Sequence, residues 1–129
     1  MTLTDTFAKK HVEKWINAWN NQELNALLEM YSDEIQFSSP KIKSILPNRR
    51  SLQLSNKKEL EEYWTLALEK YPNLRFEAKE VIVHNDTLVL EYIASLNGID
   101  RTWVMEKFEF KDNKITTSSV FYGAEGLLQ

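Results

Sequence analysis

The spacing of apolar residues changes once along the chain, and this change limits the folds that it can adopt. Up to about residue 71, apolar side chains recur every three or four positions, as in Val12, Trp15, Ile16 and Trp19. From residue 75 onward, segments rich in Val, Ile, Phe, Tyr and Trp frequently alternate with polar residues. Helices followed by an antiparallel meander of strands indicate the α+β class.

Three helices are expected in the first part of the chain. The first runs from Thr4 or Asp5 to about Asn20, and the second covers about 22–31. The third covers about 57–71, where Asn56 and Glu59 form a start that resembles a capping box. A short strand is expected at 35–37. Residues 41–55 show no clear period, so a loose hairpin or a strand and loop is expected there.

Four strands are expected in the second part, at 75–83, 87–96, 100–111 and 114–122. The dipeptide Asn97-Gly98 is typical of a two-residue hairpin turn. That turn pairs Tyr92 with Trp103 and predicts one sheet face toward the helices, composed of Leu90, Tyr92, Ala94, Trp103 and Met105.

The same register places Glu91 and Glu106 on the outer sheet face, as solvated groups or partners in a subunit interface. Phe108 and Phe110 have the same parity along the strand as Glu106, so this register would place them on the outer face too. A bulge or strong curvature near Lys107 is therefore expected.

Composition excludes several classes of site. A length of 129 residues predicts one domain, 1–129, and the absence of Cys excludes disulfides and thiolate chemistry. Two distant His and three Gly predict no metal site, no phosphate loop and no bound cofactor. A net charge of −3 argues against nucleic acid. The N-terminus lacks signal-peptide features and no apolar run approaches the roughly 18 residues of a membrane helix, so a cytoplasmic protein is expected.

One segment departs from this acidic balance. Between Pro40 and Lys58 there are six basic residues and no acid. A solvated loop and helix start is the plain interpretation. The alternative is a surface that faces an anion, either a substrate carboxylate or phosphate or an acidic partner.

The order of elements and one stretch resemble a known family. Residues 15–40 read WINAWNNQELNALLEMYSDEIQFSSP. This stretch is similar to the opening of the SnoaL-like and nuclear transport factor 2-like superfamily: a helix, a polar turn, a short helix and a strand before Pro. The resemblance implies a curved antiparallel sheet wrapped around helices as a cone, an apolar pocket at its wide end, and a homodimer that packs through the outer sheet face. Activities in the superfamily include ketosteroid isomerisation, polyketide cyclisation, dehydration and epoxide hydrolysis, besides binding without catalysis.

The catalytic groups implied by the resemblance are largely absent. Ser39 stands where a ketosteroid isomerase has its basic Asp, and Trp15 and Trp103 stand where it has its Tyr and protonated Asp. A hydroxyl without a partner base cannot shuttle a proton near neutral pH, and an indole is only a donor. His11 and Glu106 are left as weak catalytic candidates.

The leading hypothesis is therefore a protein that binds a small hydrophobic or aromatic molecule in an apolar pocket. A divergent isomerase, dehydratase or cyclase is the alternative, and a protein-interaction module using residues 41–58 is a further one. Aromatic residues make up 12% of the chain, and they either fill the core or line this pocket. The expected ligand-binding residues are Trp15, Trp19, Tyr31, Ser39, Trp64, Leu90, Tyr92, Trp103, Met105, Ser118 and Tyr122.

Overall fold

The computed structural model describes residues 2–123 and shows helices packed against one curved sheet. The helices are α1 (Asp5–Asn20), α2 (Leu24–Glu29), α3 (Ile42–Ile45) and α4 (Lys57–Lys70). The strands are β1 (Tyr31–Ser38), β2 (Gln53–Leu54), β3 (Arg75–His84), β4 (Thr87–Ser95), β5 (Thr102–Lys111) and β6 (Lys114–Tyr122). The predicted α+β class is confirmed. No helix within residues 2–123 is both long and apolar enough to cross a membrane.

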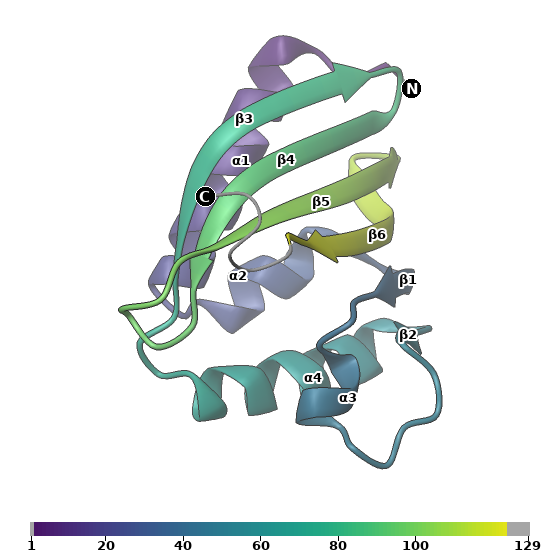
Figure 1. The fold of residues 1–129 in the computed structure, drawn as a ribbon. Coiled ribbons are helices and arrows are strands. Elements are labelled where there is room, and N and C mark those ends of the chain that lie inside the picture. The colour runs from purple at the N-terminus through teal and green to yellow at the C-terminus, as the bar shows by residue number, and fades with distance from the viewer. Residues whose placement is uncertain (1, 124–129) are drawn as a thin grey trace.

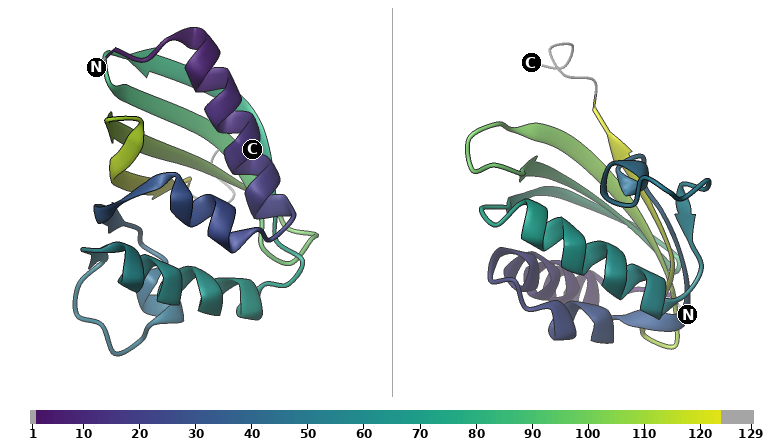
Figure 2. Two further views of the ribbon diagram at one scale, coloured as in Figure 1. Left: turned by 180° about the vertical axis from the view of Figure 1, so that it is seen from behind. Right: turned by 90° about the horizontal axis from the view of Figure 1, so that it is seen from below.

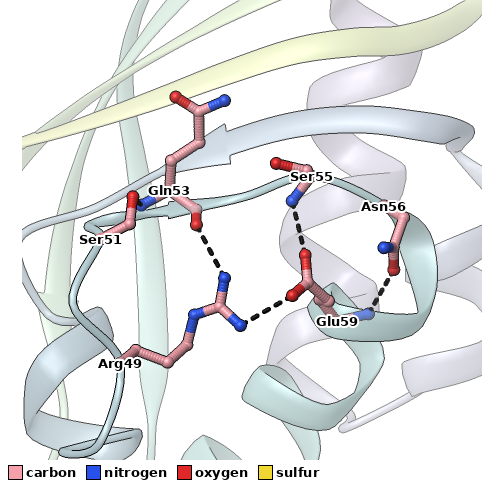
Figure 3. Close-up of polar contacts among 6 residues, drawn as sticks. All are labelled: Arg49, Ser51, Gln53, Ser55, Asn56 and Glu59. Carbon is pink, nitrogen blue, oxygen red and sulfur yellow. Dashed lines mark hydrogen bonds and ion pairs between the residues drawn. The ribbon is translucent and has the colours of Figure 1, made fainter.

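Side-chain caps fix the start of both long helices. Thr4 Oγ1 accepts a hydrogen bond from the Phe7 amide at 3.0 Å, and Asn56 Oδ1 accepts one from the Glu59 amide at 2.8 Å. Each cap satisfies an amide that has no partner within its helix, which is worth about 1 kcal/mol. Glu59 also accepts a hydrogen bond from the Ser55 amide at 2.8 Å, as Figure 3 shows. The expected starts of these two helices are confirmed.

Two expectations for shorter segments need correction. The second helix ends at Glu29 rather than near residue 31, because Tyr31 enters the sheet opposite Ile115 of β6. Residues 41–55 form the short helix α3, which was not expected, and then a loop and the two-residue strand β2, so the expected hairpin is wrong and the alternative of a strand and loop holds for the end of the segment. Arg49 holds this segment against α4, because its guanidinium donates to Glu59 Oε2 at 2.7 Å and to the Gln53 carbonyl at 3.1 Å (Figure 3).

The six strands form one open sheet in the order β2-β1-β6-β5-β4-β3. All neighbouring strands are antiparallel except β1 and β6, which run parallel. The sheet curves around α1, α2 and α4, which cover its inner face (Figures 1 and 2). The apolar core lies between these layers, and its most deeply buried aromatic side chains include Trp15, Tyr31 and Phe108.

The predicted register between β4 and β5 is wrong by one residue. Tyr92 lies opposite Val104 and Leu90 opposite Glu106, whereas Trp103 lies opposite Ile93. Since side chains alternate along a strand, a shift of one residue moves every side chain of β5 to the other face. Trp103 and Met105 are therefore on the outer face, with 38% and 46% of their surface exposed.

The connection between β4 and β5 explains the shift. It is longer than a two-residue turn, because Asn97 Oδ1 accepts hydrogen bonds from the Ile99 amide at 2.9 Å and the Asp100 amide at 2.8 Å. A side chain that satisfies the two amides following the turn stabilises a wider loop. In the observed register Phe108 and Phe110 face inward together with Val104, and β4 and β5 pair without interruption. The irregularity lies instead between β5 and β6, at Glu109 and Phe110.

Candidate functional site

A cavity lies between the helices and the inner face of the sheet. Nine aromatic side chains form much of its wall, contributed by α1, α4 and the surrounding strands: Trp15, Trp19, Phe37, Tyr63, Trp64, Tyr71, Phe76, Tyr92 and Tyr122. The centre of a water molecule can move through a volume of about 60 Å³ within it. Since one water needs about 10–15 Å³ by this measure, the cavity has room for a few waters or a compact ligand.

Among the described residues, Glu106 provides the one carboxyl group that lines this cavity. Only 3% of its surface is exposed, and its expected place on the outer face is wrong because of the register shift. Tyr92 Oη donates a hydrogen bond to Glu106 Oε1 at 2.9 Å, and Ser118 Oγ donates one to Oε2 at 2.9 Å. The two hydroxyls come from β4 and β6, the neighbours of β5 on either side. Together they fix the carboxyl in one orientation.

The surroundings of Glu106 change its proton affinity. Burial raises the pKa of Glu106 to about 7, although the hydrogen bonds from Ser118 and Tyr92 act in the opposite direction. Burial likewise raises the pKa of Tyr63 to about 12 and that of Tyr92 well above its usual value. The tyrosines are therefore neutral hydrogen-bonding groups. Glu106, in contrast, is able both to accept and to donate a proton near neutral pH.

The indole groups in the wall differ in their hydrogen bonding. Trp15 Nε1 donates to Tyr31 Oη at 2.9 Å, so this donor is already occupied within the core. Trp19 Nε1 is buried and has no hydrogen-bond partner among the described residues. An unpaired buried N–H costs about 1–3 kcal/mol, which makes Trp19 the indole that would gain most from an acceptor atom of a ligand.

The expected ligand-binding residues fall into three groups. Those that line the cavity are Trp15, Trp19, Ser39, Trp64, Tyr92 and Tyr122. Tyr31, Leu90 and Ser118 are fully buried behind the wall, where Tyr31 and Ser118 make the hydrogen bonds just described. Trp103 and Met105 lie on the opposite face of the sheet and do not approach the cavity.

His11 is not part of this cavity. It packs against Phe108 and Phe110, with ring centroids 5.8 and 4.9 Å away, and borders a separate groove with Phe7. Burial, with a smaller effect from the charge of Lys14, lowers its pKa to about 4. The histidine is therefore neutral at pH 7. As a catalytic candidate it therefore has no contact with this cavity.

Many residues of the wall were not expected from the sequence, among them Tyr63, Tyr71 and Lys41. Tyr63 and Tyr71 come from α4 or its end, and Lys41 comes from the basic segment. Tyr63 lies three positions after Leu60 and four before Ala67, so helical spacing places it on the same face as both. That spacing is the signal that could have identified it.

The basic segment is divided among several roles. Arg49 pairs with Glu59 at 2.7 Å and Lys57 with Asp33 at 3.4 Å, so both cations serve local structure. Lys41 instead lines the cavity. Among residues 2–123, no group of three or more His, Asp or Glu side chains is arranged to hold a metal ion.

Comparison with known proteins gives one family. A family model described as a SnoaL-like domain matches residues 12–118. The chain is similar to a SnoaL-like protein of unknown function from Burkholderia thailandensis, with 30% identity, 96% and 100% of the two chains covered and a TM-score of 0.86. A search of curated proteins gave no significant match.

More distant structures share the fold alone. A candidate polyketide cyclase from Sinorhizobium meliloti is 14% identical. The match covers 85% of this chain and 92% of the cyclase chain, with a TM-score of 0.70. A candidate ketosteroid isomerase from Kribbella flavida is 11% identical. The match covers 95% of this chain and 87% of the isomerase chain, also with a TM-score of 0.70.

Proposed function

Because the chain belongs to the SnoaL-like domain family, we propose that it binds a small, largely apolar molecule in the cavity and recognises one polar group of that molecule through Glu106. The observation that carries this proposal is a single carboxyl group, buried among aromatic rings and oriented by Tyr92 and Ser118. Among the described residues no other carboxyl group lines the cavity. A pocket with apolar walls and a few placed polar groups is the usual form of a small-molecule site.

The walls favour a flat, compact ligand. Aromatic side chains on both the helices and the sheet offer ring faces and edges for stacking. The N–H of Trp19, which has no partner among the described residues, is a second polar group, and an acceptor such as a carbonyl oxygen would satisfy it. Because the centre of a water-sized sphere can reach only about 60 Å³ of the cavity, the ligand is expected to be of the size of one substituted ring.

The four tryptophans provide a direct binding experiment. Titration with a neutral phenol, followed through the indole N–H signals by NMR, is expected to give saturable shifts for Trp15, Trp19 and Trp64. Trp103, on the outer face, is an internal control whose signal should stay in place.

A matched pair of variants locates the effect. Ala67→Phe, which fills the cavity, is expected to abolish the shifts, whereas Leu66→Phe on the exposed side of α4 should preserve them. Absence of saturable shifts, or shifts that survive Ala67→Phe, would contradict binding in the cavity.

A second candidate function is proton transfer on the bound molecule. It is favoured by the position of Glu106 in the cavity wall and by its pKa of about 7, which suits a general acid or base at neutral pH. The expected signature is seen with a small aromatic ketone in heavy water: a proton on the carbon beside the carbonyl exchanges for deuterium from the solvent. Glu106→Gln should lower the rate of this exchange at least about a hundredfold. Exchange that continues unchanged in that variant would exclude this role.

The homodimer implied by the family is also part of this proposal. The outer sheet face exposes Trp103, Met105, Phe121 and Ile82, which is an apolar surface suited to a second copy of the chain. Light scattering is expected to give twice the 15.2 kDa of one chain, and a mass of one chain at high concentration would contradict it.

A further inference from the structure

Lys41 is a cation in the wall of a cavity that is otherwise mostly aromatic. Among the described residues it is the only cationic side chain that lines the cavity, and it makes no ion pair with any of them. Its Nζ lies 5.2 Å from the ring centroid of Tyr122, another residue of the wall. The ring attracts the ammonium electrostatically, and Lys41 Nζ donates no hydrogen bond to any described residue.

The backbone around Lys41 is held in place. Its amide donates to Ser39 Oγ at 3.2 Å, and Ser39 is itself buried in the cavity wall. The residue as a whole is half-buried. A charge in such a place is screened less than one on the open surface and interacts more strongly with an opposite charge.

A second ammonium stands near the same part of the wall. Lys70 Nζ donates to the Ser44 carbonyl at 3.3 Å and lies 5.5 Å from the ring centroid of Tyr71. Both Ser44 and Tyr71 line the cavity. Two lysines therefore stand against tyrosines of the wall, and the only carboxyl group among the described wall residues is Glu106. Lys41 and Lys70 thus place two positive charges beside this part of the wall, although the chain as a whole carries −3.

We propose that the ligand of this cavity is a small organic acid with an aromatic or other apolar body, whose carboxylate pairs with the ammonium of Lys41. This inference rests on the proposed function, because it names the class of molecule that the same cavity binds. It also gives a role to one of the basic residues of 41–58 that no local ion pair uses. The apolar body lies against the aromatic rings, and Lys41 fixes the end of the ligand that carries the charge.

The test compares two probes of nearly the same shape, phenylacetate and phenylacetamide. In the wild-type protein, phenylacetate is expected to bind about three- to tenfold more tightly, because only the carboxylate pairs with Lys41. Lys41→Met keeps the apolar stem and should reduce this ratio to about one, whereas Lys41→Arg should keep most of it. Lys43→Met is the matched control on α3, since Lys43 is exposed and outside the cavity, and it should leave the ratio unchanged.

The outcomes separate this inference from the proposed function. If both probes bind equally, or if the ratio survives Lys41→Met, the acid specificity is overturned while binding in the cavity stands. If neutral phenols bind and phenylacetate does not, the same conclusion follows. If neither the phenols nor the two probes bind, both the proposed function and this inference fall. A ratio lost in Lys41→Met and kept in Lys43→Met supports the inference.

Discussion

Replacement of Trp15 by alanine is expected to lower the free energy of unfolding by about 3–5 kcal/mol, which is the largest effect we expect of any single substitution. Only 1% of the Trp15 surface is exposed. Its ring packs against Phe76 and Phe108 at centroid distances of 5.5 Å and against Tyr92 at 5.4 Å. Loss of the indole leaves a large void among these rings and also removes the hydrogen bond to Tyr31. Urea unfolding followed by circular dichroism measures the change.

Two further variants make this result specific. Trp15→Phe keeps most of the ring but removes the N–H, so Tyr31 loses its donor and a smaller cost of about 1–2 kcal/mol is expected. Ile99→Ala is the control, because 82% of the Ile99 surface is exposed and its loss should change stability by less than about 0.5 kcal/mol. A Trp15→Ala protein as stable as the wild type would show that the ring is not packed in the core.

The free energy of unfolding of the wild-type protein is expected to fall as the pH rises through the range in which Glu106 ionises. Replacement of Glu106 by glutamine is expected to remove this fall. The pKa of Glu106 is about 7 in the folded protein, against an ordinary value of 4.5 that the unfolded chain retains. Between these values the folded state holds the proton and the unfolded state does not, so each pH unit lowers the free energy of unfolding by about 1.4 kcal/mol. The stabilisation is therefore complete below pH 4.5 and lost above about pH 7, roughly 3 kcal/mol in all.

The variant and the wild type are compared at several pH values, because the difference isolates this one carboxyl from all other titrating groups. Glutamine stays neutral, so the variant is expected to match the wild type near pH 4 and to exceed its stability by roughly 3 kcal/mol near pH 8. Glu91→Gln on the outer face is the control for removing one negative charge. A difference that does not change with pH would mean that Glu106 ionises as freely in the folded protein as in the unfolded chain.

Local signals in the sequence were enough to predict the long helices and the four strands of the meander. The starts of α1 and α4 depend on Thr4 and Asn56, whose side chains bond amides within the next three residues. The turns at 84–87 and 111–114 likewise depend on Asn and Asp residues, and Asn85 and Asn113 have the positive φ values of 54° and 65° expected of them. Each of these features is decided by residues that are adjacent in the chain.

The position of Glu106 could not be predicted from the turn signal alone. Asn97-Gly98 favours a two-residue turn, but the Asn97 side chain bonds the amides of Ile99 and Asp100 and so widens the loop. The signal for the correct register was present on the strand itself, because Val104, Phe108 and Phe110 share a parity and need no bulge against β4 if they face inward. The apolar pattern of β5 therefore predicts its register better than the turn does, and in that register Glu106 faces the cavity.

Part of the cavity wall follows from local spacing. Helical spacing assigns Trp15, Trp19 and Trp64 to the buried faces of α1 and α4, and these side chains line the cavity. Lys41 was not distinguished from the other basic residues of its segment, because its place in the wall depends on α3, a helix of four residues without a clear sequence pattern. Contacts between distant segments decide that part of the site.

The parallel pairing of β1 with β6 has a consequence for the order of events during folding. The hydroxyl of Ser38 donates a hydrogen bond to that of Ser119 across these strands, and the two residues are separated by 81 positions in the sequence. Closing so long a loop is entropically costly, so strand pairs joined by short turns are expected to form earlier and this pair later. Ser39 and Lys41 follow β1, and Tyr122 ends β6, so the two sides of the cavity meet only when that pair closes. A ligand that needs both sides therefore stabilises the finished protein by slowing its unfolding rather than by guiding its folding.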